Sequence, residues 1–186
     1  TPEFVDLGNA ESRTAFLKVW PLGKFPVLHD ASRDQLVPES SIIIEYLQLH
    51  HAAGDARLFP QETDAALQVR FWDRFCDFYV MTPMQALTAE RLRAPDSRSV
   101  DASAAATATL LKAYGVLDRQ LANTEWLAGG NFSLADCAAA PCLFYAVAYV
   151  PFPDGSAHLT EYFERLMERG DVAAVVDAAR PWLRMF

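Results

Sequence analysis

Residues that could bind a small charged molecule are concentrated between Lys24 and Ser40. Glu39 and Ser40 directly precede an aliphatic run that starts at Ile42, which is where a helix is expected to begin. The free N–H groups and the dipole of a helix start favour a carboxylate, and Ser40 adds a hydroxyl donor. Glu39 can receive an ammonium group beside it. The pair therefore predicts either a site for an α-amino acid group or a simple helix cap.

Pro26 is the second unusual feature of this segment. It interrupts the apolar run from Phe25 to His29, although a proline has no N–H to give to a neighbouring strand. An edge position, a bulge or a cis peptide bond would explain it, and X–Pro bonds adopt the cis form at low cost. A cis bond would turn the backbone of Val27 towards an extended peptide ligand. An edge proline without a ligand is the simpler alternative.

The surrounding sequence predicts the elements that would position these residues. Turn-forming residues, helix caps and apolar alternation indicate, in order, a strand over 3–7, a short helix capped by Asn9 and ended by Pro21, a hairpin of residues 25–29 and 35–37, and a helix from Ser40 to about Ala52. This order predicts an α/β domain over residues 1–52.

The rest of the chain has helical periodicity. Gly54 and Pro60 interrupt a segment with few periodic apolar residues, so residues 53–61 are predicted to be a linker. Beyond it, apolar residues recur three and four positions apart, namely Phe71, Trp72, Phe75, Phe78 and Tyr79, and then Leu110, Tyr114, Leu117 and Leu121. Residues 62–186 are therefore predicted to form an all-α domain.

Composition excludes several classes of protein. The 186 residues are 52% hydrophobic, and no run approaches the roughly 18 apolar residues of a membrane span. The formal net charge of −8 disfavours nucleic acid and anionic membranes as main partners. Three cysteines without a CxxC pair, Cys76, Cys137 and Cys142, indicate reduced core thiols of a cytosolic protein.

Other polar residues carry weaker signals. His50 and His51 are adjacent and have no cysteine or carboxylate at metal-ligand spacing, so we expect surface residues and no metal site. Arg91, Arg93 and Arg98 lie in a polar connection between two predicted helices. They could bind a phosphate, but a solvated loop is the favoured interpretation.

Three segments of this chain resemble the glutathione-binding half of the cytosolic glutathione S-transferase family: "GKFPVL" (23–28), "PESSII" (38–43) and "EYL" (45–47). "RLFP" (57–60), "NFSLADCAAAP" (131–141) and "ARPWLRMF" (179–186) resemble the interdomain linker, a capped helix start and a common ending of that family. The resemblance implies a thioredoxin-like N-terminal domain, incomplete at its N-terminus, followed by a helical bundle. Ser133 and Asp136 would be a structural helix cap.

The resemblance also implies roles for the first group of residues. Pro26 would be the cis-proline of the family, and the backbone of Val27 would pair with the cysteinyl part of glutathione. Glu39 and Ser40 would hold the γ-glutamyl end, and Lys24 would approach the glycyl carboxylate. Glutathione would be a co-substrate, with no metal involved.

The function implied is attack of the glutathione thiolate on a small apolar electrophile, in detoxification. Phe75, Phe78 and Tyr79 could line the electrophile pocket, although core or dimer packing is the alternative. Family members begin with a strand and helix that carry a catalytic Tyr, Ser or Cys, so we expect about 25 to 40 residues upstream of Thr1, the usual length of such a unit. A cytoplasmic homodimer is expected, without nucleic acid or membrane partners.

Two other functions remain open. The first is a non-catalytic interaction or regulatory module on the same fold, because a fold does not determine a function. The second, a dithiol oxidoreductase, is disfavoured because the sequence has no CxxC pair.

Overall fold

The computed structural model describes residues 1–52 and 57–180, and the chain divides into two compact units. Unit 1 comprises Thr1–Arg57 and unit 2 comprises Leu58–Phe186. Residues 53–56 of the predicted linker and residues 181–186 of the family-like ending lie outside the described residues.

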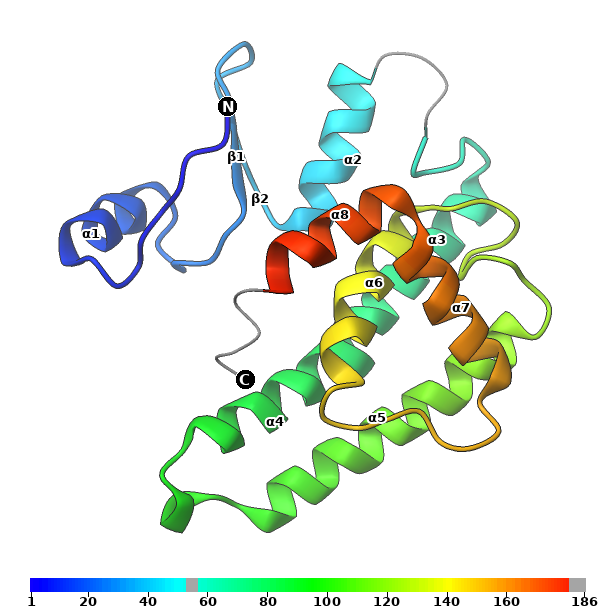
Figure 1. Ribbon diagram of the computed structural model, residues 1–186. Helices are drawn as coiled ribbons and strands as arrows, with labels where there is room; N and C mark the ends of the chain where they lie inside the picture. Colours follow the sequence, from blue (N-terminus) through cyan, green and yellow to red (C-terminus); the bar gives the residue numbers. More distant parts are fainter. Residues whose placement is uncertain (53–56, 181–186) are drawn as a thin grey trace. The chain divides into compact units, whose positions relative to one another are not determined.

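Unit 1 contains two helices and a hairpin, coloured blue to cyan in Figure 1. In chain order they are α1 (Ala10–Val19), β1 (Val27–Asp30), β2 (Gln35–Pro38) and α2 (Ser40–His51). The Asn9 side chain caps α1, accepting hydrogen bonds from the N–H groups of Glu11 and Ser12 at 3.0 Å each. The predicted helix, hairpin and second helix are therefore confirmed.

The strand predicted over residues 3–7 is wrong for this structure. Residues 1–6 have no strand conformation, and β1 and β2 pair only with each other in the described sheet. Alternating apolar residues form a strand only when a neighbouring strand supplies backbone partners, and no strand of the described residues pairs with this segment.

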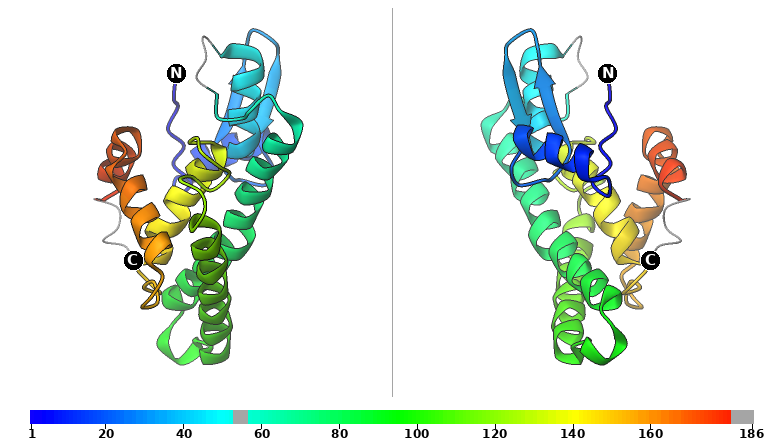
Figure 2. Two further views of the ribbon diagram at one scale, coloured as in Figure 1. Left: turned by 90° about the vertical axis from the view of Figure 1, so that its right-hand side faces the viewer. Right: turned by 90° about the vertical axis from the view of Figure 1, so that its left-hand side faces the viewer.

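Unit 2 is all helical, as predicted. Its elements are α3 (Thr63–Phe75), the π-helix η1 (Cys76–Met81), α4 (Thr82–Leu92), the 3-10 turn η2 (Pro95–Ser97), α5 (Val100–Leu121), α6 (Leu134–Ala146), α7 (Ala157–Glu168) and α8 (Gly170–Ala179). The segments α3, η1 and α4 follow each other without a break, and α4 lies beside α5 (Figures 1 and 2). Leu110, Tyr114 and Leu117 of α5 are completely buried, so the predicted apolar face of that helix is its core face.

A buried carboxylate organises the start of α6. Asp136 is fully buried and accepts hydrogen bonds from the Ser133 N–H (2.8 Å), the Leu127 N–H (3.0 Å) and the Tyr162 hydroxyl (2.7 Å). Burial raises the pKa of Asp136, and these donors oppose that effect because they stabilise the charged form. The structure thus places Ser133 at the N-cap of α6 and Asp136 in its first turn, where they form a capping box.

Candidate functional site

The hairpin register brings two parts of the predicted site together. β1 and β2 are antiparallel, and Val27 lies opposite Pro38. The chain enters β1 through Pro26 and leaves β2 through Glu39, so both lie at the same end of the hairpin. Ser40 follows as the first residue of α2. Residues that are 13 positions apart in the sequence therefore become neighbours through a single strand pairing.

The entry to β1 has one of the three conformations that would explain Pro26, and it is the one that the family resemblance implies. The Phe25–Pro26 peptide bond is cis. Lys24 and Pro26 are exposed, whereas Val27 is half-buried. Pro38, the partner of Val27, has no N–H, so the Val27 carbonyl cannot receive a hydrogen bond from it. The strand backbone at Val27 and the exposed side chain of Lys24 therefore lie at the same end of the hairpin.

Glu39 has an unusual backbone conformation. It is the N-cap of α2 with φ +69° and ψ 120°, a region that residues with a side chain rarely adopt. Its side chain makes no capping hydrogen bond, and the first turn of α2 contains no acidic residue. Such a conformation costs about 1–3 kcal/mol and is found preferentially at functional sites. The exposed carboxylate and the helix start can accordingly bind an ammonium and a carboxylate side by side.

A second carboxylate fixes the far end of the hairpin to α2. Asp30, 9% exposed, accepts hydrogen bonds from the hydroxyls of Ser32 (2.6 Å) and Tyr46 (2.8 Å), and lies 2.7 Å from His51 Nε2. The hydrogen bonds from Ser32 and Tyr46 hold the pKa of Asp30 well below its ordinary value. Because Tyr46 and His51 are on α2, the cluster joins the hairpin to the helix that begins at the site.

Sequence reasoning treated His51 as a surface residue and missed this cluster. His51 is 40% exposed at its side chain but pairs with the buried Asp30. Asp30 followed two residues later by Ser32 is a turn signal, and the Ser32 N–H does donate to Asp30. The contact to His51 spans 21 residues, and no local pattern reports it.

The aromatic residues predicted to line an electrophile pocket lie in unit 2 and separate into two groups. Phe75 is 8% exposed and packs in the core, with its ring centroid 5.2 Å from Trp72 and 5.1 Å from Tyr79. Phe78 and Tyr79, on η1, are 58% and 53% exposed. Core packing therefore accounts for Phe75, and a ligand could reach the other two rings.

The three arginines of the predicted polar connection lie where the chain turns from α4 to α5, and the polar contacts of Arg93 and Arg98 are within this turn. Arg98 donates to the carbonyls of Arg91 at 2.8 Å and Arg93 at 3.3 Å, and Arg93 pairs with Glu90 at 2.9 Å. These contacts explain Arg93 and Arg98 without a bound phosphate.

Two family models match this chain. The model described as the glutathione S-transferase N-terminal domain matches residues 2–55, and the model described as the glutathione S-transferase C-terminal domain matches residues 75–170. The chain belongs to the glutathione S-transferase family. Unit 1 is accordingly the thioredoxin-like domain of this family and unit 2 its helical domain.

Similar proteins support this assignment. Glutathione S-transferase GstB of Escherichia coli K12 is 26% identical, over 87% of this chain and 77% of its own. Glutathione S-transferase F10 of Arabidopsis thaliana is 32% identical, over 83% of this chain and 71% of its own. A glutathione S-transferase structure from Methylobacillus flagellatus KT with glutathione bound has a TM-score of 0.79 at 25% identity, covering 92% of this chain and 84% of that one.

The described residues of this transferase family member show no features of a metal site or of a membrane-spanning helix. Over residues 1–52 and 57–180, no group of three or more His, Cys, Asp or Glu side chains could hold a metal ion. None of the helices described is both long enough and apolar enough to span a bilayer. Cys76 and Cys142 are buried, in agreement with the prediction of core thiols, and burial raises the pKa of the half-buried Cys137 to about 11.

Proposed function

We propose that this protein is a glutathione transferase that joins glutathione to a small apolar electrophile. The observation that carries the proposal is the convergence of the Val27 backbone, the Glu39 carboxylate and the N-terminus of α2 at one end of a hairpin. These groups complement an extended peptide backbone, an ammonium and a carboxylate respectively. Glutathione offers all three, and the related structure from M. flagellatus has it bound.

Each residue would bind a different part of glutathione. The Val27 backbone would pair with the cysteinyl residue as a strand partner. Glu39 would bind the γ-glutamyl ammonium, while the N–H groups of α2 and the Ser40 hydroxyl would hold the adjacent carboxylate. The exposed Lys24 would reach the glycyl carboxylate. Pro26 would shape the backbone that precedes Val27 and make no polar contact of its own.

The chemical step would be a nucleophilic displacement or addition. The glutathione thiolate attacks the electrophilic carbon and a C–S bond forms. In a displacement the leaving group departs with its bonding electrons; in an addition the π bond of the acceptor breaks, and its electrons move to the neighbouring atom, which takes up a proton. Phe78 and Tyr79 would bind the apolar part of the electrophile. A Ser, Tyr or Cys would activate the thiol, as the family resemblance implies. Tyr46 is not a candidate, because its hydroxyl donates to Asp30 and its pKa is raised by burial and by that bond.

The second candidate is a binding module that holds glutathione without catalysis. It stays a candidate because a fold does not determine a function. We further propose that the protein acts in detoxification as a cytoplasmic homodimer, as the family resemblance implies.

Calorimetric titration with glutathione tests the proposal. The protein should bind glutathione, and Glu39→Gln should weaken binding by about 1–3 kcal/mol because a charge-assisted contact is lost. Glu3→Gln, in the N-terminal segment that has no regular secondary structure, lies outside the site; it is the matched control and should bind like the wild type. Conjugation of an aryl halide then separates the two candidates: turnover supports the transferase, and binding without turnover supports the module. Absence of binding at millimolar glutathione contradicts both.

A further inference from the structure

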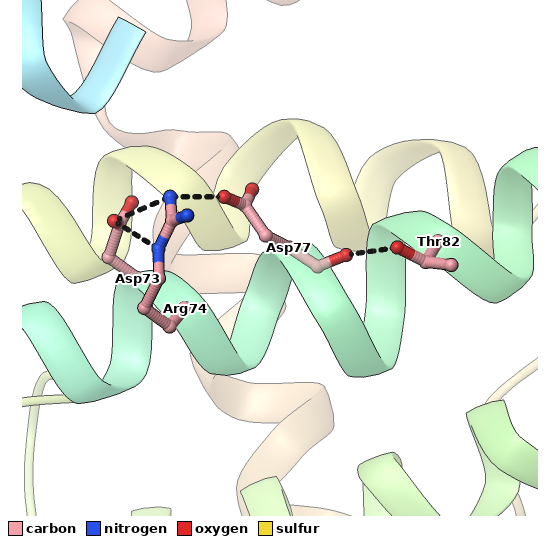
Figure 3. Close-up of polar contacts among 4 residues, drawn as sticks. All are labelled: Asp73, Arg74, Asp77 and Thr82. Atoms are coloured by element: carbon pink, nitrogen blue, oxygen red, sulfur yellow. Dashed lines mark hydrogen bonds and ion pairs between the residues drawn. The ribbon is translucent and has the colours of Figure 1, made fainter. Parts of the chain in front are cut away.

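The continuous helical segment α3–η1–α4 of unit 2 contains a wide turn, η1, which carries the exposed aromatic residues Phe78 and Tyr79. In η1 the N–H and the hydroxyl of Thr82 both donate to the carbonyl of Asp77, the hydroxyl at 2.9 Å (Figure 3). An α-helix would instead pair the Thr82 N–H with the carbonyl of Phe78, one residue later. Single π-turns within α-helices are frequent at functional sites, so this turn is a candidate for a role beyond packing.

Pro83 provides a reason for the wide turn. A proline inside an α-helix clashes with the carbonyl four residues earlier, here that of Tyr79, and a wider turn relieves the clash. Pro83 also has no N–H for the carbonyl of Tyr79 or of Phe78. The carbonyl groups of this turn consequently outnumber the backbone N–H groups that could bond to them. The Thr82 hydroxyl adds a second bond to the Asp77 carbonyl and so strengthens the wide conformation.

The side chain of Asp77 is held as well. Arg74 Nη2 lies 2.5 Å from its carboxylate, and the same guanidinium contacts Asp73 at 3.3 Å and 3.4 Å (Figure 3). Arg74 also lies 5.7 Å from the centroid of the Phe78 ring. Asp77 is therefore fixed through both its carboxylate and its carbonyl, and the network extends to one of the exposed rings.

The two sides of the turn have opposite environments. Cys76 and Val80 are completely buried, which fixes one side in the core. Phe78 and Tyr79 are more than half exposed on the other side. Since helical side chains project in directions set by the backbone, the width of this turn decides where the two rings point.

We propose that Thr82 is a positioning residue for an aromatic electrophile. Its hydroxyl holds the wide turn, and the turn directs the rings of Phe78 and Tyr79 so that a planar aromatic group can stack against them. This inference rests on the proposed function, since it specifies the class of electrophile. Thr82 acts through the two aromatic residues and makes no contact with the electrophile.

The test is Thr82→Val, which removes the hydroxyl and keeps the shape of the side chain. We expect KM for an aryl halide, 1-chloro-2,4-dinitrobenzene, to rise about three- to tenfold, the range of one net hydrogen bond, with kcat and the Kd for glutathione unchanged. Thr82→Ser should restore the wild-type KM. Thr109→Val is the matched control, because the Thr109 hydroxyl bonds to the Ala105 carbonyl at 3.0 Å in the ordinary helix α5.

Binding of an unreactive analogue makes the test independent of turnover. We expect 2,4-dinitrotoluene, followed by quenching of tryptophan fluorescence, to bind Thr82→Val more weakly than the wild type by the same factor. Pro83→Ala restores a backbone N–H donor and lets the turn narrow, so it should also weaken the binding of 2,4-dinitrotoluene. If the wild type has no turnover, the proposed function fails, and the analogue alone decides the role of Thr82. Equal affinities in all variants, or failure of Thr82→Ser to restore binding, would overturn the inference.

Discussion

Glu39 combines a strained backbone with an exposed carboxylate, and the two properties have different consequences. The positive φ angle costs stability whatever the side chain does, whereas the carboxylate matters only when a ligand is present. A sequence can reveal the second property, because a polar residue at a helix start suggests a ligand or a cap. It cannot reveal the first, since nothing in Pro-Glu-Ser-Ser encodes a positive φ at a residue that is not glycine.

Substitutions at Glu39 should separate strain from binding. Glu39→Gly removes both the carboxylate and the strain, while Glu39→Ala removes only the carboxylate. We expect the glycine variant to have a free energy of unfolding up to about 1 kcal/mol above that of the alanine variant. Both should bind glutathione more weakly than the wild type by about 1–3 kcal/mol. Denaturant unfolding and calorimetry measure the two effects.

Asp34 supplies the control for this comparison. It also has a positive φ, 50°, but lies in the turn between β1 and β2, away from the proposed site. Asp34→Gly should therefore stabilise the protein relative to Asp34→Ala without changing the Kd for glutathione. Equal stability of Glu39→Gly and Glu39→Ala would show that the backbone at Glu39 is not strained.

The sequence correctly predicted those helices and turns whose formation depends on residues close together in the chain. Asn9 caps α1, the turn after Asp30 closes the hairpin, and α2 begins at Ser40 as expected. The strand over residues 3–7 was wrong because pairing depends on a neighbour. The π-turn before Pro83 was missed because helical periodicity in the surrounding residues masks one wide turn.

The Asp30 cluster should make the attachment of α2 to the hairpin sensitive to acid. The pKa of the Asp30 carboxyl group in the folded protein lies below its ordinary value of 3.8. The charged carboxylate therefore contributes stability that is fully present above about pH 4 and is lost as the pH falls through the folded-state pKa. Asp30→Asn should be less stable than the wild type at pH 7, and the difference should shrink below pH 4. Unfolding free energies between pH 7 and pH 3 test this, with Asp34→Asn as the control; a difference independent of pH would contradict it.

The capping carboxylate of α6 should have a larger effect on stability. Asp136→Ala would leave the N–H groups of Ser133 and Leu127 and the Tyr162 hydroxyl without their buried acceptor. We expect a loss of about 3–5 kcal/mol in the free energy of unfolding, as for a broken buried polar network. Asp177→Ala, at a residue exposed on α8, should change it by less than about 0.5 kcal/mol. A similar loss in both variants would show that Asp136 has no special structural role.

For the whole molecule, the order of patterns predicted an α/β unit followed by a helical unit, because the change from hairpin signals to helical periodicity occurs once, near Gly54. The same patterns do not report how deeply a helix is buried. The Ile-rich helix α2 has no fully buried residue, and Ile42 is 53% exposed. Periodicity identifies the helix, but burial depends on what packs against it.

The exposed apolar side chains of α3 bear on the proposed homodimer. Leu67 and Phe71, one turn apart on this helix, are 59% and 51% exposed, and aromatic residues are enriched at protein interfaces. A charge introduced there would have to be desolvated when two copies associate, at a cost that a surface residue elsewhere would not incur. Sedimentation equilibrium at micromolar concentration should therefore show a dimer for the wild type and a monomer for Phe71→Glu. Leu111→Glu, at a residue 40% exposed on α5, should remain dimeric. A wild-type monomer would contradict the homodimer, and a dimer that survives Phe71→Glu would show that α3 is not its interface.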